Sequence, residues 1–125
     1  MPLGLLTFHH FYSKQKLVAL RALAKKHALQ GIFKRGRPGM LLITGPDEDS
    51  VGRCITAVKR MRWQRVEVRG VAPRLWLQLP GRDGELVESE RVRDVVAVAR
   101  EWGGGEVERW VKVCMGFGGE EEGAG

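Results

Sequence analysis

Apolar and polar positions alternate with two different periods along the first third of the chain. Residues 5–12, LLTFHHFY, are rich in apolar and aromatic types and lack a helix breaker, which predicts a first strand. From Ser13 to Ala28 the apolar residues recur at helical spacing, and lysine and arginine occupy the other sectors. We therefore expect an amphipathic helix that Ser13 caps and that ends near Gly31, where glycine suits the left-handed C-terminal position.

A hairpin is expected next. Ile32 and Phe33 precede a turn-forming stretch, and residues 40–44 form a short apolar run after it. Pro38 and Gly39 fit the central positions of a type II turn, because proline fixes φ and glycine accepts a positive φ. Two strands are thus predicted on either side of this turn.

The second half of the pattern predicts a helix followed by further strands. Residues 47–50, DEDS, offer capping oxygens and negative charge to a helix with an apolar stripe from Val51 to Met61. The alternation over residues 65–69 and again over 74–79 predicts two strands. Residues 80–90 are polar and turn-rich, which is typical of a mobile connection.

The C-terminal part is expected to add a helix and a strand. From Val92 onward, valines and alanines recur at helical spacing, which predicts a helix that ends at three consecutive glycines, residues 103–105. The next segment, residues 106–115 (EVERWVKVCM), is predicted to form a last strand. The tail, residues 116–125, is glycine- and glutamate-rich and is predicted to be disordered. We assign residues 1–115 to a single domain.

The order of the expected elements indicates a fold. Strand, helix, strand, strand, helix, strand over residues 5–70 is the order of a ferredoxin-like α+β sandwich, in which two helices cover one face of an antiparallel sheet. The remaining strand, helix and strand would extend this core.

The stretch KRGRPGMLLITGP, residues 34–46, raises the question of a phosphate-binding loop. Such a loop needs a glycine-rich turn, a lysine and a hydroxyl at the start of a helix. Here Gly45 is followed by Pro46, which lacks a backbone donor, and by two carboxylates, which would repel phosphate. The glycines are therefore assigned to hairpin turns.

Other reactive constellations are also unfavourable. His9 and His10 are adjacent and would point to opposite faces of a strand, and neither Cys54 nor Cys114 has a partner at zinc spacing. We expect two reduced, half-buried thiols, no metal and no cofactor. With no acid and base pair in view, we expect a protein that is not an enzyme and has no small-molecule substrate.

Charge gives the chain its clearest functional signal. The net charge of +6 is unevenly divided, since residues 1–70 hold fourteen Lys and Arg against four acidic residues, and residues 71–125 hold seven against eleven. A basic half favours a polyanion such as RNA, which cations bind through phosphates and aromatic rings bind by stacking. The candidate RNA-binding residues are His10, Tyr12, Lys14, Lys16, Arg35, Arg37, Lys59, Arg60, Arg62 and Trp63.

Each of these residues also has a structural interpretation. Trp63 fits core or rim packing, and the helix lysines fit a solvated face. A protein-interaction module that docks a partner through a sheet edge or an apolar patch is the alternative function. No run of residues is apolar and long enough to cross a bilayer, so we expect an intracellular protein without membrane contact, nuclear or cytoplasmic.

Three segments together resemble a known family: residues 8–16, 29–46 and 59–69. The family is the C-terminal domain shared by the pre-mRNA-processing protein three of the spliceosomal tri-snRNP and by proteins that carry it behind an RWD domain. The matching positions are His9, His10, Lys14, Leu29, Gly31, Pro38, Gly39, Gly45 and Trp63.

The resemblance implies a ferredoxin-like fold without catalysis. It also implies a role linked to small nuclear RNA or pre-mRNA processing, since the splicing member helps to bind a base-paired RNA with a single-stranded tail. The glycine-rich acidic tail and the short 80–90 connection make the chain more similar to the RWD-linked branch. That branch implies an RWD domain as a further partner and a chain that is part of a longer protein.

Overall fold

The protein folds around one mixed sheet. The computed structural model describes residues 2–79 and 81–116. Its elements are β1 (Leu3–Phe8), α1 (Lys14–Lys26), β2 (Gln30–Lys34), β3 (Gly39–Thr44), α2 (Glu48–Arg60), β4 (Val66–Ala72), β5 (Leu86–Ser89) and α3 (Val92–Cys114). The strand order is β4-β1-β3-β2-β5, with β5 parallel to β2 and the other pairs antiparallel. The α+β class and the ferredoxin-like core predicted from the sequence are confirmed.

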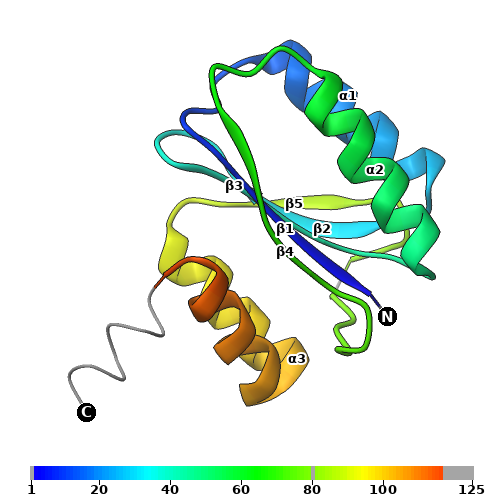
Figure 1. Cartoon of the computed structure of the whole chain (residues 1–125), viewed down its shortest axis with the longest axis vertical. Coiled ribbons are helices and arrows are strands. Elements are labelled where there is room, and N and C mark those ends of the chain that lie inside the picture. Colours follow the sequence, from blue (N-terminus) through cyan, green and yellow to red (C-terminus); the bar gives the residue numbers. More distant parts are fainter. Residues whose placement is uncertain (1, 80, 117–125) are drawn as a thin grey trace.

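Helices cover both faces of the sheet (Figure 1). Leu20 of α1 and Val51 of α2 pack with Leu6 and Leu41 in one apolar cluster. The second cluster forms on the other face, where α3 lies. Because both faces are covered, β1 and β3 are buried at every position, which explains why their apolar residues are consecutive rather than alternating.

The two helix N-caps are as predicted. The Ser13 side chain accepts a hydrogen bond from the Lys16 backbone N–H, and the Asp47 side chain accepts one from Ser50. The bond from Ser50 lowers the pKa of the Asp47 carboxyl, because it stabilises the charged form. Local capping chemistry therefore sets where both helices begin.

The first strand and first helix end earlier than predicted. β1 stops at Phe8 rather than at residue 12, and α1 stops at Lys26, with Ala28 in the left-handed conformation at φ 53°. Gly31 lies inside β2, where a Cβ would approach a Leu86 side-chain carbon to 2.6 Å. Close packing of the strands, rather than a helix terminus, accounts for Gly31.

The β2–β3 hairpin also differs from the predicted type II turn. The positive φ, 97°, belongs to Gly36, and the Arg37–Pro38 peptide bond is cis. Gly39 instead begins β3 opposite Phe8, where an added Cβ would lie 2.6 Å from Cβ of Phe11. Gly39 is therefore required for the close approach of the connection that follows β1.

Residues 74–79 are not a strand, although their alternation is real. Leu77 and Leu79 are buried in the α3-side cluster, and Trp76 between them is exposed. No strand within residues 2–79 and 81–116 pairs with this segment. Side chains bind its backbone instead: Thr44 Oγ1 donates to Leu77 O, and Leu79 N donates to Gln30 Oε1. The alternation of apolar and polar residues therefore indicated an extended segment with one buried side. In the structure this segment lies outside the sheet.

The predicted connection over residues 80–90 contains β5. Gly31 to Lys34 of β2 pair in parallel with Leu86 to Ser89. Four residues with one buried apolar side chain carry almost no periodic signal, so the partner strand decides this element.

The predicted last strand, residues 106–115, is the second half of α3. Val107 and Val111 are both buried, one helical turn apart, against the sheet. Gly104, at φ 80°, kinks the helix at the predicted stop, and the helix then resumes. The C-terminal extension is therefore a strand and a kinked helix. The predicted disordered tail lies outside the described residues, apart from Gly116.

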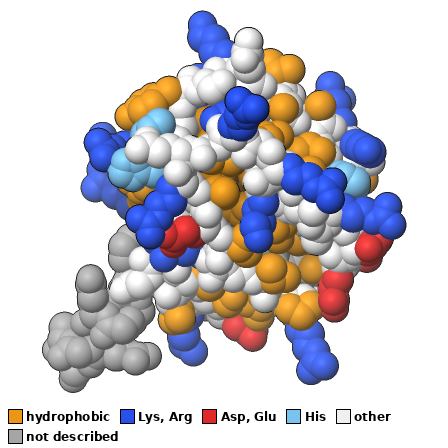
Figure 2. Space-filling view, turned by 45° about the horizontal axis from the view of Figure 1, so that its top comes forward, with side chains coloured by type: hydrophobic (Ala, Val, Ile, Leu, Met, Phe, Trp, Pro, Cys, Tyr) orange, Lys and Arg blue, Asp and Glu red, His pale blue; other side chains and the backbone are white. Residues whose placement is uncertain are grey.

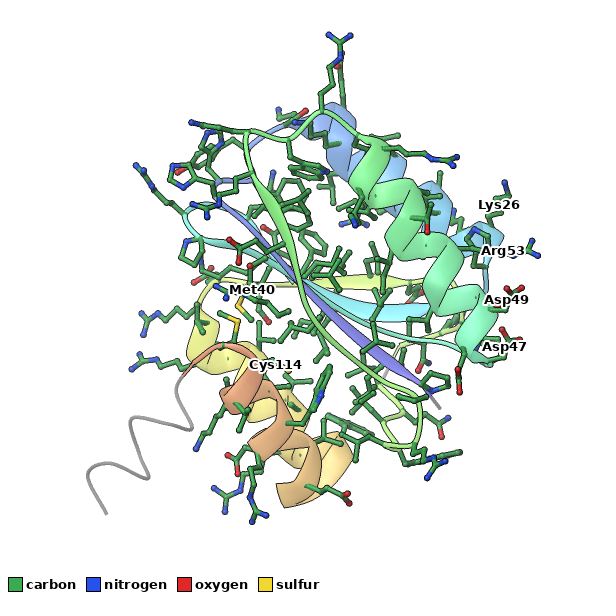
Figure 3. The ribbon with its side chains drawn as sticks, viewed as in Figure 1. Lys26, Met40, Asp47, Asp49, Arg53 and Cys114 are labelled. Atoms are coloured by element: carbon green, nitrogen blue, oxygen red, sulfur yellow. The ribbon has the colours of Figure 1, made fainter. Side chains whose placement is uncertain are left out.

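The two cysteines lie on opposite faces of the sheet and are both free. Cys54 packs in the α1/α2 cluster, and Cys114, the last residue of α3, packs against the sheet near Met40 (Figure 3). Burial raises the pKa of the Cys54 thiol to about 11, and it also raises that of Cys114, where the charge of Arg69 opposes the shift. Both thiols therefore stay protonated at neutral pH.

We expect a thiol reagent to modify Cys114 before Cys54, because Cys54 is only 3% exposed while Cys114 is partly exposed. Timed alkylation of the native protein at neutral pH, followed by peptide mass spectrometry, measures both rates. Alkylation in denaturant is the control and should make the two rates similar. Equal rates in the native protein would contradict this placement.

No helix within residues 2–79 and 81–116 combines the length and the apolar character that a bilayer crossing needs.

Candidate nucleic-acid interface

The topology brings the basic residues of distant segments to one end of the sheet. β1 and β2 end here, and β3 and β4 begin here. The first turn of α1, which follows β1, and the last turn of α2, which precedes β4, lie at the same end. We call this surface the cationic end. Its residues are Lys14, Lys16, Arg35, Arg37, Lys59, Arg60, Arg62, Arg65 and Arg69.

Direct contacts join the three connections that form the cationic end. Phe11 and Gly36 exchange two backbone hydrogen bonds of 2.8 and 2.9 Å, which tie the β1–α1 loop to the hairpin. The α2–β4 loop is joined to the same segment, since His9 N donates to Arg65 O at 3.0 Å and His10 Nε2 contacts Gln64 Oε1. The candidate residues on these loops are therefore held close together.

Several cations of this end have no acidic partner. Six of them form no ion pair with another described residue: Lys14, Lys16, Arg37, Lys59, Arg60 and Arg62. Arg35 differs, because Glu88 of β5 binds it through two contacts of 2.9 and 3.3 Å. Arg35 is therefore the predicted RNA-binding cation whose charge the C-terminal segment neutralises.

Basic and acidic side chains are unevenly distributed over the surface of the molecule. Lys and Arg side chains lie over the left, the top, the centre and the right of the space-filling view, and an acidic patch adjoins the group on the left (Figure 2). Asp47 and Asp49 lie at the opposite end, where Asp49 pairs with Arg53 at 2.9 Å (Figure 3). A polyanion that reaches the cationic end therefore meets more basic than acidic side chains there.

An exposed aromatic pair lies within the cationic end. The rings of His10 and Tyr12 stack with centroids 5.6 Å apart and an interplanar angle of 26°. Tyr12 is 63% exposed, which is a high value for a large aromatic side chain. The pair offers an accessible π-surface beside unpaired cations.

The ring of Trp63 is packed against neighbouring side chains. Its ring stacks on Phe8 at 4.0 Å, its Nε1 donates to Val58 O at 2.9 Å, and Nζ of Lys16 lies 4.4 Å from the ring centroid. The structural interpretation therefore describes Trp63 better than base stacking does. Its contact with Lys16 positions that cation at the start of α1.

The candidate set leaves out other residues of this end: Thr7, His9, Arg65 and Arg69. Arg69 Nε donates to Thr7 Oγ1 at 2.9 Å across the β1–β4 pair. The pairing register shifts between Leu5 and Leu6, opposite Arg69. A sequence pattern of alternating residues does not show this shift, so the direction of Arg69 was not predictable.

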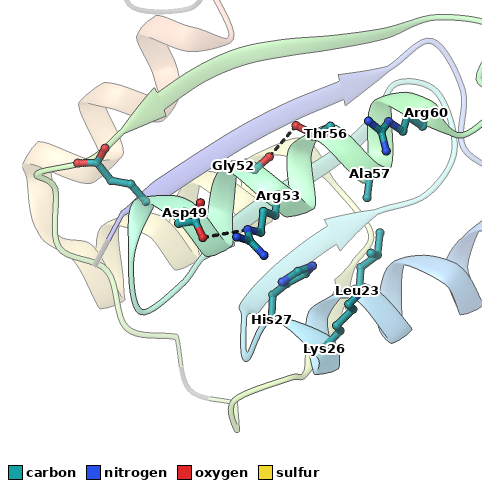
Figure 4. A pocket seen from close by; sticks show the side chains of 10 residues that line it. Leu23, Lys26, His27, Asp49, Gly52, Arg53, Thr56, Ala57 and Arg60 are labelled. Carbon is teal, nitrogen blue, oxygen red and sulfur yellow. Dashed lines mark hydrogen bonds and ion pairs between the residues drawn. The ribbon is translucent and has the colours of Figure 1, made fainter.

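A hollow lies between α1 and α2 (Figure 4). It measures about 560 Å³, and its lining mixes acidic and basic side chains, with Glu48 and Asp49 near Arg53 and Lys26. Mixed charges suit neither a polyanion nor a polycation, so this groove is a weaker candidate than the cationic end. Over residues 2–79 and 81–116, no three His, Cys, Asp or Glu side chains come together as a metal site requires.

Comparison with known proteins supports the fold. No family model and no curated protein matches the chain. Among solved structures, the acylphosphatase from Bacillus subtilis is similar, with a TM-score of 0.51 and 17% sequence identity over 69% of this chain and 96% of that one. At this identity the likeness concerns the fold alone. The resemblance to the pre-mRNA-processing family stays a prediction.

Proposed function

We propose that the domain binds RNA through the cationic end and carries out no reaction of its own. The observation that carries the proposal is the convergence of unpaired cations from α1, α2 and the loop after α2 onto one end of the sheet, beside an exposed aromatic pair. Phosphates would bind the cations, and an unpaired base would stack on Tyr12.

The chemistry favours a structured RNA with a single-stranded segment. The cations follow two helix ends and a hairpin, so they can contact successive phosphates of a backbone. The exposed aromatic pair reaches only unstacked bases, which a duplex does not offer. A role in small nuclear RNA or pre-mRNA processing is the specific form of this proposal that the family resemblance suggests.

The proposal predicts steep salt dependence. For an RNA duplex with a single-stranded overhang, engaging about five phosphates gives a log–log slope near −4, so affinity should fall about 10²-fold between 50 and 200 mM salt. Fluorescence polarisation with a labelled RNA measures this slope. A blunt duplex of equal length is the matched probe and should bind more weakly. Absent binding at 50 mM salt, or an affinity indifferent to salt, would overturn the proposal.

A protein-interaction function is the second candidate, and one surface favours it. β4 is an edge strand, and beside it a largely apolar hollow of about 450 Å³ is lined by Leu75, Trp110 and Val113. Trp76 is 63% exposed nearby in sequence. An RWD domain or another protein that pairs with the edge strand would cover this surface.

One experiment separates the two functions. Val71→Lys places a charge on the exposed face of β4 and should abolish partner capture without changing RNA affinity, if the second function holds. Lys59→Glu/Arg62→Glu should do the reverse under the first function.

A further inference from the structure

A small cationic cavity lies at the end of β1, beside the stacked aromatic pair, because the ring of His9 in its lining lies 5.4 Å from the ring of His10. It measures about 280 Å³, and its polar lining comes from Thr7, His9, Arg37, Arg65, Glu67 and Arg69. Met115, directly after α3, completes one side. This volume is slightly below the usual range of ligand sites, which is about 300–1,000 Å³. The cavity fits a phosphate with part of its sugar rather than stacked bases.

The lining of the cavity carries an excess of two positive charges. Three guanidinium groups face the cavity against the one carboxylate of Glu67. Glu67 binds Arg65 through Nε at 3.2 Å and Arg69 through Nη1 at 3.4 Å. These contacts occupy one nitrogen of each guanidinium and hold both groups in place, so the remaining terminal nitrogens are available to an anion.

The third arginine is held by a histidine rather than by an acid. Nη2 of Arg37 lies 2.8 Å from Nε2 of His9, and a guanidinium has no acceptor, so Arg37 donates and His9 accepts. Arg37 therefore keeps its full charge. Its hairpin is braced by buried Lys34, whose Nζ donates to the Pro38 and Arg35 carbonyls at 2.7 and 3.2 Å.

The floor of the cavity is a buried hydroxyl. Thr7 is only 6% exposed, and its Oγ1 accepts a hydrogen bond from Arg69 Nε. Because the hydroxyl accepts from Arg69, its own proton remains available to donate. Arg69 is thus fixed at two points, by Thr7 and by Glu67, which reduces the entropy lost when an anion binds.

We propose that this cavity binds a phosphate monoester at the end of an RNA strand. A terminal phosphate carries a charge of about −1.5 to −2 at neutral pH, which matches the excess of two positive charges, whereas an internal phosphodiester carries one. A terminal phosphate is also joined to the RNA on one side only, so the cavity needs a single opening through which the RNA strand leaves. This inference rests on the proposed RNA-binding function and deepens it.

The test compares RNAs that differ only at one end. Single-stranded oligonucleotides of one sequence carry a 5′-phosphate, a 3′-phosphate or hydroxyls at both ends. The wild-type protein should prefer one phosphorylated form about tenfold, because two or more guanidinium groups bind the additional charge. Arg37→Gln/Arg69→Gln should abolish the preference. Arg62→Gln, outside the cavity, should weaken all three RNAs and keep their ratio.

A second probe does not depend on RNA. Inorganic phosphate at millimolar concentration should shift the amide NMR signals of Thr7 and His9 in the wild type and not in Arg37→Gln/Arg69→Gln. A native-like spectrum elsewhere is the control that this variant is folded. Equal affinity for all three RNAs, or a preference that survives in the double variant, would overturn the terminal-phosphate site. Shifts with phosphate but no binding of any RNA would remove the RNA function and leave an anion site for a mononucleotide.

Discussion

Phe11→Ala is expected to lower the free energy of unfolding by about 3–5 kcal/mol, the usual range for truncating a fully buried aromatic residue. Phe11 is 0% exposed and has rings on several sides, with Phe8 at 5.7 Å, Trp63 at 5.4 Å and Phe33 at 6.1 Å. Its backbone also exchanges two hydrogen bonds with Gly36. The cavity would open where the β1–α1 loop, the hairpin and the α2–β4 loop meet.

The neighbouring residue supplies the matched control. Tyr12→Ala removes an aromatic ring that is 63% exposed, so unfolding free energy should change by less than about 0.5 kcal/mol. Urea unfolding followed by circular dichroism measures both variants. RNA affinity should fall in Tyr12→Ala at unchanged stability, because a stacked base is worth about 1–3 kcal/mol. Similar stabilities of the two variants would contradict the packing described for Phe11.

Lys59→Glu/Arg62→Glu is expected to weaken RNA binding about 30-fold or more at 50 mM salt. Each substitution removes one phosphate contact and adds a negative charge that repels the backbone, and neither cation has an ion-pair partner among the described residues. The log–log salt slope should become about 1.5 units shallower, since two contacts are lost. Fluorescence polarisation at four salt concentrations gives both quantities.

Arg74→Glu/Arg82→Glu is the matched control for net charge. Both residues are exposed and lie toward the opposite end of the sheet, after β4 ends and before β5 begins. This variant changes the total charge by the same amount, so it should weaken binding less than about threefold through long-range potential. Equal losses in the two double variants would mean that net charge, rather than the cationic end, determines affinity.

Much of the ferredoxin-like core was predictable because its signals are local. Ser13 and Asp47 cap helices through bonds to residues three positions later, and the stripe from Val51 to Val58 follows the helical period. The basic candidates of both helices were also identifiable, since lysine and arginine outside the apolar stripe face solvent. Local geometry alone relates these residues to one another.

Interpretation of the C-terminal third failed where the signal depended on a distant partner. Apolar and polar residues alternate over residues 74–79 as in a strand. The backbone of the two buried leucines, however, forms hydrogen bonds with the side chains of Thr44 and Gln30 and not with a neighbouring strand. Residues 106–115 show valines at positions compatible with both periods, and packing of Val107 and Val111 on the sheet selects the helix. β5 exists because β2 offers it a free edge.

The candidate site divides in the same way. The amino-acid sequence by itself determined which residues carry positive charge, that the net positive charge lies in the first 70 positions, and which segments form the helices of the core. Only the tertiary structure decided that Arg35 is neutralised by Glu88, that Trp63 is packed, and that Thr7, Arg37 and Arg69 line one cavity. The physical reason is that charge and capping are properties of single residues or short stretches, whereas ion pairs, stacking and cavities form between segments that only strand pairing brings together.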